Sequence, residues 1–182
     1  MKHGCFFLLA YFCLLSLYGQ NVSQTPPPPA IDSTIVFTID STIKELYNSI
    51  SGEKDVPRNW KQFKFLFRKD AKLIPSGKDK NGKWKTLYMS PDDYIKSSKD
   101  WLVSNGFIER EIKRKVERFG NIAQVFSSYE CYHNNEEERP FMRGVNSIQL
   151  LNDGQRWWII NLFWTHETSE TPIPDKYLRA TF

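Results

Sequence analysis

Apolar side chains in the first half of the chain recur at spacings of three and four, which is the period of an amphipathic helix. One helix is predicted over residues 38–51, with an apolar stripe of Ile39, Ile43, Leu46, Tyr47 and Ile50. A second is predicted over 59–67, where the apolar positions are mainly aromatic. A third begins at Ser90-Pro91, because serine caps a helix and proline fits its first position, and ends at Asn105-Gly106.

From residue 107 onwards apolar and polar residues alternate instead, which is the pattern of strands with one buried face. Long strands are predicted over 107–118, 122–133, 143–151 and 155–167. The segment Asn152-Asp-Gly154 is a strong hairpin signal between the last two. Shorter strands are predicted over 71–75 and 84–89. Helices followed by consecutive antiparallel strands predict an α+β fold.

Residues 1–19 have the pattern of a signal peptide, in which Lys2 is followed by an apolar run that ends at Tyr18. Because that run is short for a membrane span, we expect cleavage near Gln20 and an exported protein, either periplasmic or secreted. An uncleaved membrane anchor is the alternative. Residues 20–36, which include four consecutive prolines, are predicted to form an extended linker before the domain.

Composition narrows the functions open to the mature part. A net charge of +4 in 182 residues is far from the dense basic surface of a nucleic-acid-binding protein, so no nucleic-acid partner is expected. Cleavage of the signal peptide leaves Cys131 as the sole cysteine, which excludes an internal disulfide. His133 and His166 lack the spacing of metal ligands, and the chain has no glycine-rich phosphate loop, so neither a metal nor a cofactor is expected.

Four parts of the chain resemble nuclear transport factor 2-like domains, a group that includes the SnoaL-like proteins. They are Leu46-Tyr47 with Gly52-Glu-Lys-Asp55, Trp60–Phe67 with Asp70–Leu73, Gly120–Val125, and Asn152–Ile160. The resemblance assigns residues 37–168 to this domain and leaves 169–182 as a C-terminal tail. It implies a cone-shaped α+β fold, in which three N-terminal helices pack on a curved antiparallel sheet and close the mouth of a pocket.

The resemblance also implies which residues face that pocket. Matching the last strand to the closing strand of these domains turns Trp157, Ile159, Asn161 and Phe163 towards the interior. Added to inward-facing tyrosines elsewhere, this predicts a ligand-binding set of Tyr47, Tyr94, Tyr129, Trp157, Asn161 and Phe163. In the related isomerases a tyrosine hydroxyl helps to form an oxyanion site, and Tyr47 is the residue here that resembles it. For every member of the set, packing without ligand contact is the alternative.

No acid or base for catalysis is identified from the sequence. Glu109, Glu111 and Glu117 are predicted to share a strand face with Lys113 and Lys115, which is typical of a solvated ladder of paired charges. Both histidines of the mature part lie at strand ends. The remaining acidic candidate is Asp70, at the junction of the second helix and the first strand, and its position is that of a capping residue.

The favoured function is therefore an exported domain that binds a small apolar or aromatic molecule, without demonstrable catalysis. One alternative is an isomerase-, dehydratase- or cyclase-type enzyme with acid–base chemistry near Tyr47, Tyr129 and Asn161. Another is a structural or interaction module whose cavity is filled by its own aromatic residues. An open pocket that contains a buried carboxylate or histidine favours the enzyme.

The other face of the last strand carries Trp158, Ile160, Leu162 and Trp164. An exposed apolar row of this size exceeds what soluble monomers usually tolerate, so we expect it to be covered. Domains with this resemblance often pack sheet against sheet, and this implies a homodimer through these four residues. The alternative is that the tail over 171–182 folds back over them.

Overall fold

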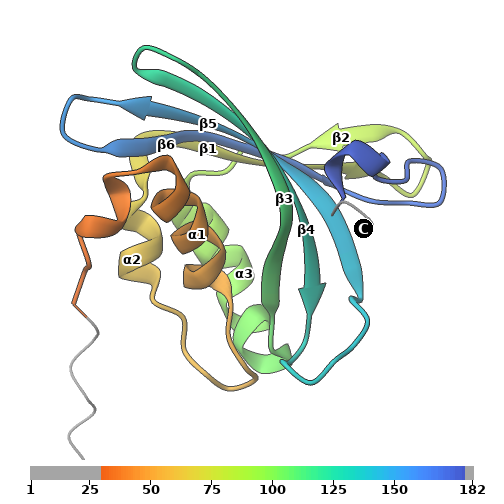
Figure 1. The fold of residues 1–182 in the computed structure, drawn as a ribbon. Coiled ribbons are helices and arrows are strands. Elements are labelled where there is room, and N and C mark those ends of the chain that lie inside the picture. The colour runs from red at the N-terminus through yellow and green to blue at the C-terminus, as the bar shows by residue number, and fades with distance from the viewer. Residues whose placement is uncertain (1–29, 179–182) are drawn as a thin grey trace, which may run out of the picture.

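Helices and strands follow one another as the sequence analysis predicts, in a computed structural model that describes residues 30–178 (Figure 1). The elements are η1 (Thr34–Val36), α1 (Ile39–Ile50), α2 (Trp60–Phe65), β1 (Phe67–Lys78), β2 (Trp84–Thr86), α3 (Pro91–Asn105), β3 (Ile108–Phe119), β4 (Ile122–Tyr132), β5 (Met142–Asn152), β6 (Trp157–His166) and η2 (Asp175–Tyr177). The predicted signal peptide, residues 20–29 of the predicted linker and residues 179–182 of the tail lie outside the described residues. Within residues 30–178, no helix is long and apolar enough to cross a membrane.

Each of the three α-helices begins at a side chain that caps its free backbone N–H groups. Thr38 Oγ1 accepts from the N–H of Ser41 at 3.0 Å, and Asn59 does the same for α2. Ser90 forms a reciprocal capping box with Asp93 at the start of α3, where Pro91 takes the first helical position. Such caps each stabilise a helix by about 1 kcal/mol, so local sequence sets these three boundaries.

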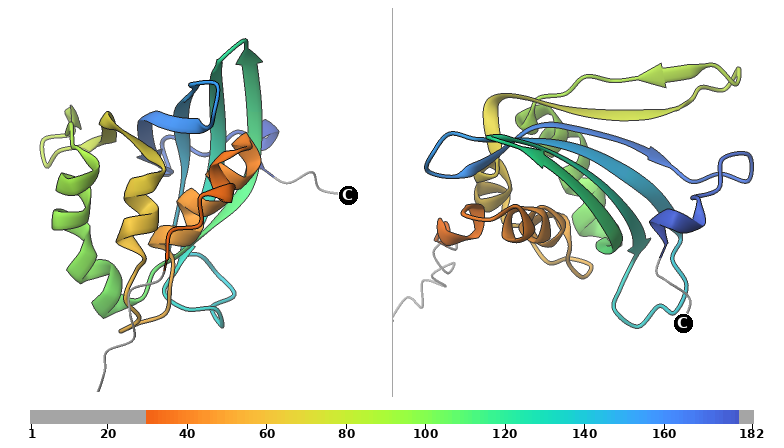
Figure 2. Two further views of the ribbon diagram at one scale, coloured as in Figure 1. Left: turned by 90° about the vertical axis from the view of Figure 1, so that its left-hand side faces the viewer. Right: turned by 45° about the horizontal axis from the view of Figure 1, so that its top comes forward.

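The six strands form one sheet in the order β2-β1-β6-β5-β4-β3. All neighbours are antiparallel except β1 and β6, which are parallel, so the sheet is mixed rather than purely antiparallel. It curves strongly, and the helices α1, α2 and α3 lie on its concave side, as the two further views show (Figure 2). We call the concave side the inner face and the opposite side the outer face.

The hydrophobic core lies between these helices and the inner face. Aliphatic residues that are almost completely buried come from all the layers: Val36, Ile43, Leu46, Leu66, Leu73, Val125, Ile148, Leu150 and Ile159. Val36 belongs to η1 and is 1% exposed, so the packed domain starts before residue 37, where the sequence analysis ended the linker. The buried core shows how a chain whose described part has no disulfide folds stably.

Two β-bulges change which residues face the core. In β3 the pairing passes from Glu111 to Lys113 and leaves Ile112 without a partner on β4. In β6 it passes from Ile159 to Asn161 and leaves Ile160 without a partner on β5. Because side chains alternate along a strand, one extra residue moves every later side chain to the opposite face.

The bulge at Ile160 corrects the predicted facing of β6. Trp157 and Ile159 precede it and are buried on the inner face, as predicted. Beyond it, the prediction is wrong. Asn161 and Phe163 lie on the outer face, and Leu162 and Trp164 lie on the inner face, where they line the cavity under the helices.

The tail folds back onto the outer face, but not over the β6 residues that the alternative in the sequence analysis named. Ile173 is buried and its N–H donates to Glu167 Oε1 at 2.9 Å. The Tyr177 ring lies 4.9 Å from the Phe126 ring, and the Tyr177 carbonyl accepts from Ser128 Oγ. The tail therefore covers the outer face of β3 and β4 rather than the apolar row predicted on β6.

Candidate functional site

A cavity of about 290 Å³ lies between the helices and the inner face of the sheet. Its walls are mainly aromatic, with contributions from Phe63, Tyr94, Trp101, Phe107, Tyr129 and Trp164. Polar groups reach it from a few positions only, chiefly Tyr47, Glu109, Asn146 and His166. An apolar cavity with a small number of converging polar groups is the usual form of a small-molecule site.

The structure brings together three of the six predicted ligand-binding residues. Tyr47 from α1, Tyr94 from α3 and Tyr129 from β4 all line this cavity. Trp157 is buried but does not line it, and the Arg118 guanidinium lies over its ring at 4.9 Å. The two that follow the bulge, Asn161 and Phe163, are on the outer face and cannot reach the cavity.

Glu109 is the acid that the sequence analysis missed. It lies on β3 before the bulge, so its side chain points inwards, and its Oε1 accepts a hydrogen bond from Asn146 Nδ2 at 3.2 Å. Burial raises the pKa of Glu109 to about 7, and the Asn146 hydrogen bond offsets only part of this effect. At neutral pH the carboxyl is therefore divided between its protonated and ionised forms.

No lysine or arginine of residues 30–178 forms an ion pair with Glu109. Its two neighbouring arginines on β3 are engaged elsewhere. The Arg110 guanidinium lies 4.5 Å from the centre of the Tyr132 ring and donates to Asn135. The Arg114 guanidinium contacts both oxygens of Glu111 and also Asp40.

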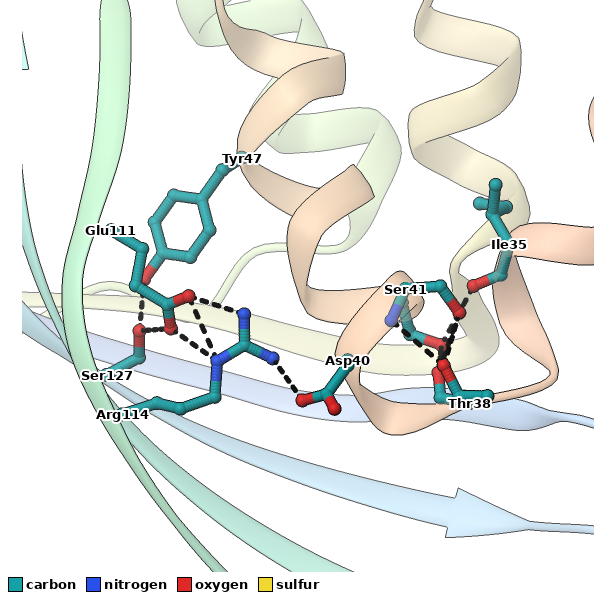
Figure 3. A network of polar contacts seen from close by, with 9 residues as sticks. Ile35, Thr38, Asp40, Ser41, Tyr47, Glu111, Arg114 and Ser127 are labelled. Carbon is teal, nitrogen blue, oxygen red and sulfur yellow. Dashed lines mark hydrogen bonds and ion pairs between the residues drawn. The ribbon is translucent and has the colours of Figure 1, made fainter.

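A hydrogen-bond chain leads from the surface ion pair to Tyr47 (Figure 3) and continues through Asn146 to Glu109. The carboxylate of Glu111 is paired with a guanidinium and so only accepts, which requires Ser127 Oγ to donate to it. Tyr47 then donates to Ser127 Oγ at 2.7 Å, and its oxygen accepts from Asn146 Nδ2 at 3.1 Å. The ion pair thus fixes the direction of the two hydroxyl bonds, and the amide NH2 of Asn146 can only donate to Tyr47 and to Glu109.

This direction decides what Tyr47 offers to a ligand. Its proton is directed at Ser127 and not at the cavity, and burial raises its pKa above the ordinary tyrosine value. The arrangement therefore leaves no free proton on Tyr47 for an oxyanion, which is the role suggested by the resemblance to isomerases. Asn146, which the sequence analysis did not single out, holds Glu109 through its amide.

His166 is the second missed residue, at the edge of the cavity and exposed on one side. Its Nδ1 lies 2.9 Å from the Tyr129 hydroxyl, and burial of the ring lowers its pKa. Burial raises the pKa of Tyr129, so the phenol keeps its proton, and in the histidine tautomer with Nδ1 unprotonated the phenol donates to Nδ1. A neutral His166 then carries its own proton on Nε2.

Gly144 makes this contact possible. It lies between Tyr129 and His166 in the same cross-strand row, and the Tyr129 side chain passes directly over it. A Cβ at Gly144 would lie 2.3 Å from the Tyr129 hydroxyl oxygen and 2.5 Å from the carbonyl oxygen of Thr165. Only glycine leaves room for the phenol to reach the histidine.

No protein-family model matches the chain, and no curated protein matches it. Solved structures do match in fold. One is a protein of unknown function with a cystatin-like fold from Nostoc punctiforme, with a TM-score of 0.55 and 12% identity, over 72% of this chain and 90% of that chain. Another is a candidate dehydratase from the NTF2-like family of Streptomyces avermitilis, with a TM-score of 0.53 and 10% identity, over 72% and 94%.

A third match is the hexachlorocyclohexane dehydrochlorinase LinA-type3 from Novosphingobium barchaimii, with a TM-score of 0.52 and 11% identity, over 71% of this chain and 84% of that chain. These matches define the class of the protein: it has the α+β nuclear transport factor 2-like fold, with three α-helices on a six-stranded, largely antiparallel sheet. Identities this low carry the fold and no activity. The predicted fold class is thus confirmed.

Proposed function

We propose that this protein binds a small, mainly apolar molecule in the cavity, with Glu109 making the polar contact. The observation that carries the proposal is an open aromatic cavity of about 290 Å³ that contains a carboxyl group without a cationic partner in the described part of the chain. A buried carboxyl without a partner is costly to keep, and a ligand that contacts it would offset that cost. The cavity also argues against a module filled by its own aromatic residues.

Blocking the cavity tests this proposal. Leu162 lines it from β6 and is 8% exposed, so Leu162→Trp would place an indole in the space that a ligand needs. We expect purified wild-type protein to release a small molecule on denaturation, detected by mass spectrometry, and the variant to release none. Phe163→Trp is the matched control, because Phe163 lies on the outer face. Equal release from all three proteins would contradict the proposal.

An acid–base enzyme is the second candidate, and Glu109 is the observation that favours it. A pKa of about 7 suits a group that accepts and returns protons at neutral pH. In an elimination, Glu109 would take a proton from carbon and the electron pair would form the double bond. The leaving group would depart as an anion with the electron pair of its bond to carbon, and the Nε2–H of His166, which lines the same cavity, would donate a hydrogen bond to it.

Isotope exchange separates the enzyme from a simple binding protein. If Glu109 transfers a proton to and from carbon, the co-purified molecule incubated with protein in D2O gains deuterium at that carbon. Glu109→Gln removes the base, so it abolishes exchange even if the variant still binds the molecule. Absence of exchange in the wild type would leave binding alone as the function.

Export and assembly are proposed on separate grounds. The charged and apolar start of the chain favours a signal peptide, and sequencing the amino terminus of exported protein tests cleavage near Gln20. For assembly, the predicted interface needs revision, because Leu162 and Trp164 line the cavity.

Ile160 remains on an apolar groove that also includes Phe119 and Ile122, which are 85% and 54% exposed. We propose that a second copy covers this groove, as apolar area of this kind is otherwise unfavourable in water. Sedimentation of Phe119→Lys beside the wild type is the test. A dimer that this change leaves intact would place the interface elsewhere.

A further inference from the structure

We propose that the ligand is a hydrophobic organic cation, an ammonium group carried on an apolar ring, whose charge lies against Glu109. This inference rests on the proposed binding function and names the class of ligand for the same cavity. It is carried by two independent features of the site. One is a carboxyl that lacks a counter-ion, and the other is the aromatic surface around it.

The carboxyl of Glu109 has room for a cationic partner and none from the protein. Among residues 30–178, Asn146 Nδ2 is the sole hydrogen-bond donor to this carboxyl, at 3.2 Å. Arg114 is the second inward-facing residue after Glu109 on β3. Its guanidinium pairs with Glu111 and Asp40 at the surface end of the hydrogen-bond chain. A carboxylate in such a site is stabilised when an opposite charge enters with the ligand.

On the cavity side, the groups that face Glu109 are uncharged at neutral pH. They are Tyr47 from α1, Tyr94 from α3, Tyr129 and Cys131 from β4, Asn146 from β5, and His166 from β6, whose pKa is lowered by burial. The charged groups near Glu109, namely Asp40, Lys44, Arg110, Glu111 and Arg114, lie with it on a separate surface hollow. Burial raises the pKa of the three phenols and of the thiol, so these groups keep their protons at neutral pH. When Glu109 is ionised, the inner part of the cavity therefore carries one uncompensated negative charge.

The walls of the cavity are suited to an ammonium group. Tyr94, Trp101, Tyr129 and Trp164 all line it, and the rings of Tyr94 and Trp164 meet edge to face with centroids 6.3 Å apart. The faces of such rings attract a cation, and the attraction is strongest where water is excluded. A neutral ligand would gain only the apolar contact and would leave the carboxylate unpaired.

The two ligand classes respond to pH in opposite directions. A cation binds the ionised form of Glu109, so its affinity falls by about tenfold for each pH unit below the pKa of that carboxyl. A neutral ligand excludes water from the carboxyl and so favours the protonated form, which strengthens its binding at low pH. Comparing a cation with a neutral molecule of the same shape therefore isolates the effect of charge.

Phenyltrimethylammonium and tert-butylbenzene form such a pair, since they differ in one central atom and in charge. We expect calorimetry with the full mature protein at about pH 8 to give at least about tenfold tighter binding of the cation. That preference should disappear by about pH 5. Glu109→Gln should remove it at every pH, whereas Glu117→Gln, on the outer face of the same strand, should leave it unchanged.

The outcomes separate this inference from the proposed function. If tert-butylbenzene binds as tightly as the cation at about pH 8, or if Glu109→Gln keeps the preference, the cavity binds ligands but the ligand class is wrong. If neither probe binds while circular dichroism shows folded protein, the proposed binding function fails with it. If the cation binds Glu117→Gln as weakly as Glu109→Gln, general surface charge explains the preference and the inference is overturned.

Discussion

The inner face of the sheet has two halves that bury different kinds of side chain. The apolar half consists of Ala123, Val125, Ile148, Leu150 and Ile159, which are all at most 6% exposed. The polar half consists of Glu109, Ser127, Tyr129, Asn146 and His166. Strands β4, β5 and β6 contribute to both halves, and β3 supplies Glu109. Along β4 and β5 the apolar pair Val125–Ile148 is followed on the same face by the polar pair Ser127–Asn146.

This difference shows how one small domain can keep a carboxyl in an unfavourable place. Each large side chain of the apolar half contributes about 1.5–3 kcal/mol by leaving water. The polar half contributes less, because its hydrogen bonds replace bonds to water and its acid loses hydration. Stability is therefore supplied by one half, which leaves the other free to hold reactive groups. Four changes test this division, from the largest expected effect to the smallest.

Ile148→Ala should have the largest effect on folding. Ile148 is fully buried at the centre of the apolar half, so its truncation leaves a cavity and should lower the free energy of unfolding by about 3–4 kcal/mol in urea titration. Gln149→Ala, on the exposed face next to it, should change that value by less than about 0.5 kcal/mol. A small effect of Ile148→Ala would mean that the apolar half does not supply the stability.

Glu109 should make the stability of the domain depend on pH. Its pKa is about 7 in the folded protein, against an ordinary value of 4.5, so between these values the folded state holds a proton that the unfolded chain has lost. The free energy of unfolding should therefore fall as pH rises through this window, by at most about 3 kcal/mol. In Glu109→Gln this dependence should vanish. Equal pH profiles for both proteins would show that Glu109 is solvated.

Gly144→Ala should disturb the contact between Tyr129 and His166. The new Cβ meets the Tyr129 hydroxyl and a backbone carbonyl, and we expect the free energy of unfolding to fall by about 2 kcal/mol. Tyr129→Phe removes the nearest clashing oxygen, so Gly144→Ala should cost less in that background. A double-mutant cycle measures the difference. Strict additivity would indicate that the contacts kept in Tyr129→Phe, with the Thr165 carbonyl oxygen and the ring carbon Cζ, account for the cost.

Ser127 and Ser128 are neighbours that face opposite sides of the sheet, so they form a matched pair. Ser127→Ala leaves Tyr47 without its acceptor and should lower the free energy of unfolding by about 1 kcal/mol. Ser128→Ala instead removes the contact to the Tyr177 carbonyl. Limited proteolysis should then cut the tail faster in Ser128→Ala than in Ser127→Ala. The reverse order would contradict the assignment of these faces.

Much of the fold can be predicted from sequence because its determinants are local. Thr38, Asn59 and Ser90 cap their helices where the pattern predicts, and Gly120 and Gly154 adopt the positive φ angles that their hairpin turns require. The parallel pairing of β1 with β6 joins segments far apart in the chain, and nothing local records it.

The site was predictable only in part, because the bulges have no sequence signal. Counting pairs back from the Phe119–Ile122 turn places Ile112 opposite Tyr129, but the bulge places Glu111 there instead. Glu109 and Glu111 thereby move to the inner face, whereas Lys113, on the other side of the bulge, stays on the outer face. The predicted ladder of paired charges is thus wrong for Glu109 and Glu111. Tyr47 and Tyr94 lie on helices, and Tyr129 lies on β4, which has no bulge. All three line the cavity, as the sequence analysis expects.

The bulge at Ile160 also has a consequence for how such a pocket changes in evolution. Loss of that single codon would place Asn161 directly after Ile159, so Asn161 would stay opposite Gln149 and every later side chain of β6 would keep its face. Trp164 and His166 would therefore still face the helices, and only the local irregularity of the bulge would disappear. Ile160 is thus a position at which an in-frame deletion would leave the β6 wall of the pocket chemically unchanged.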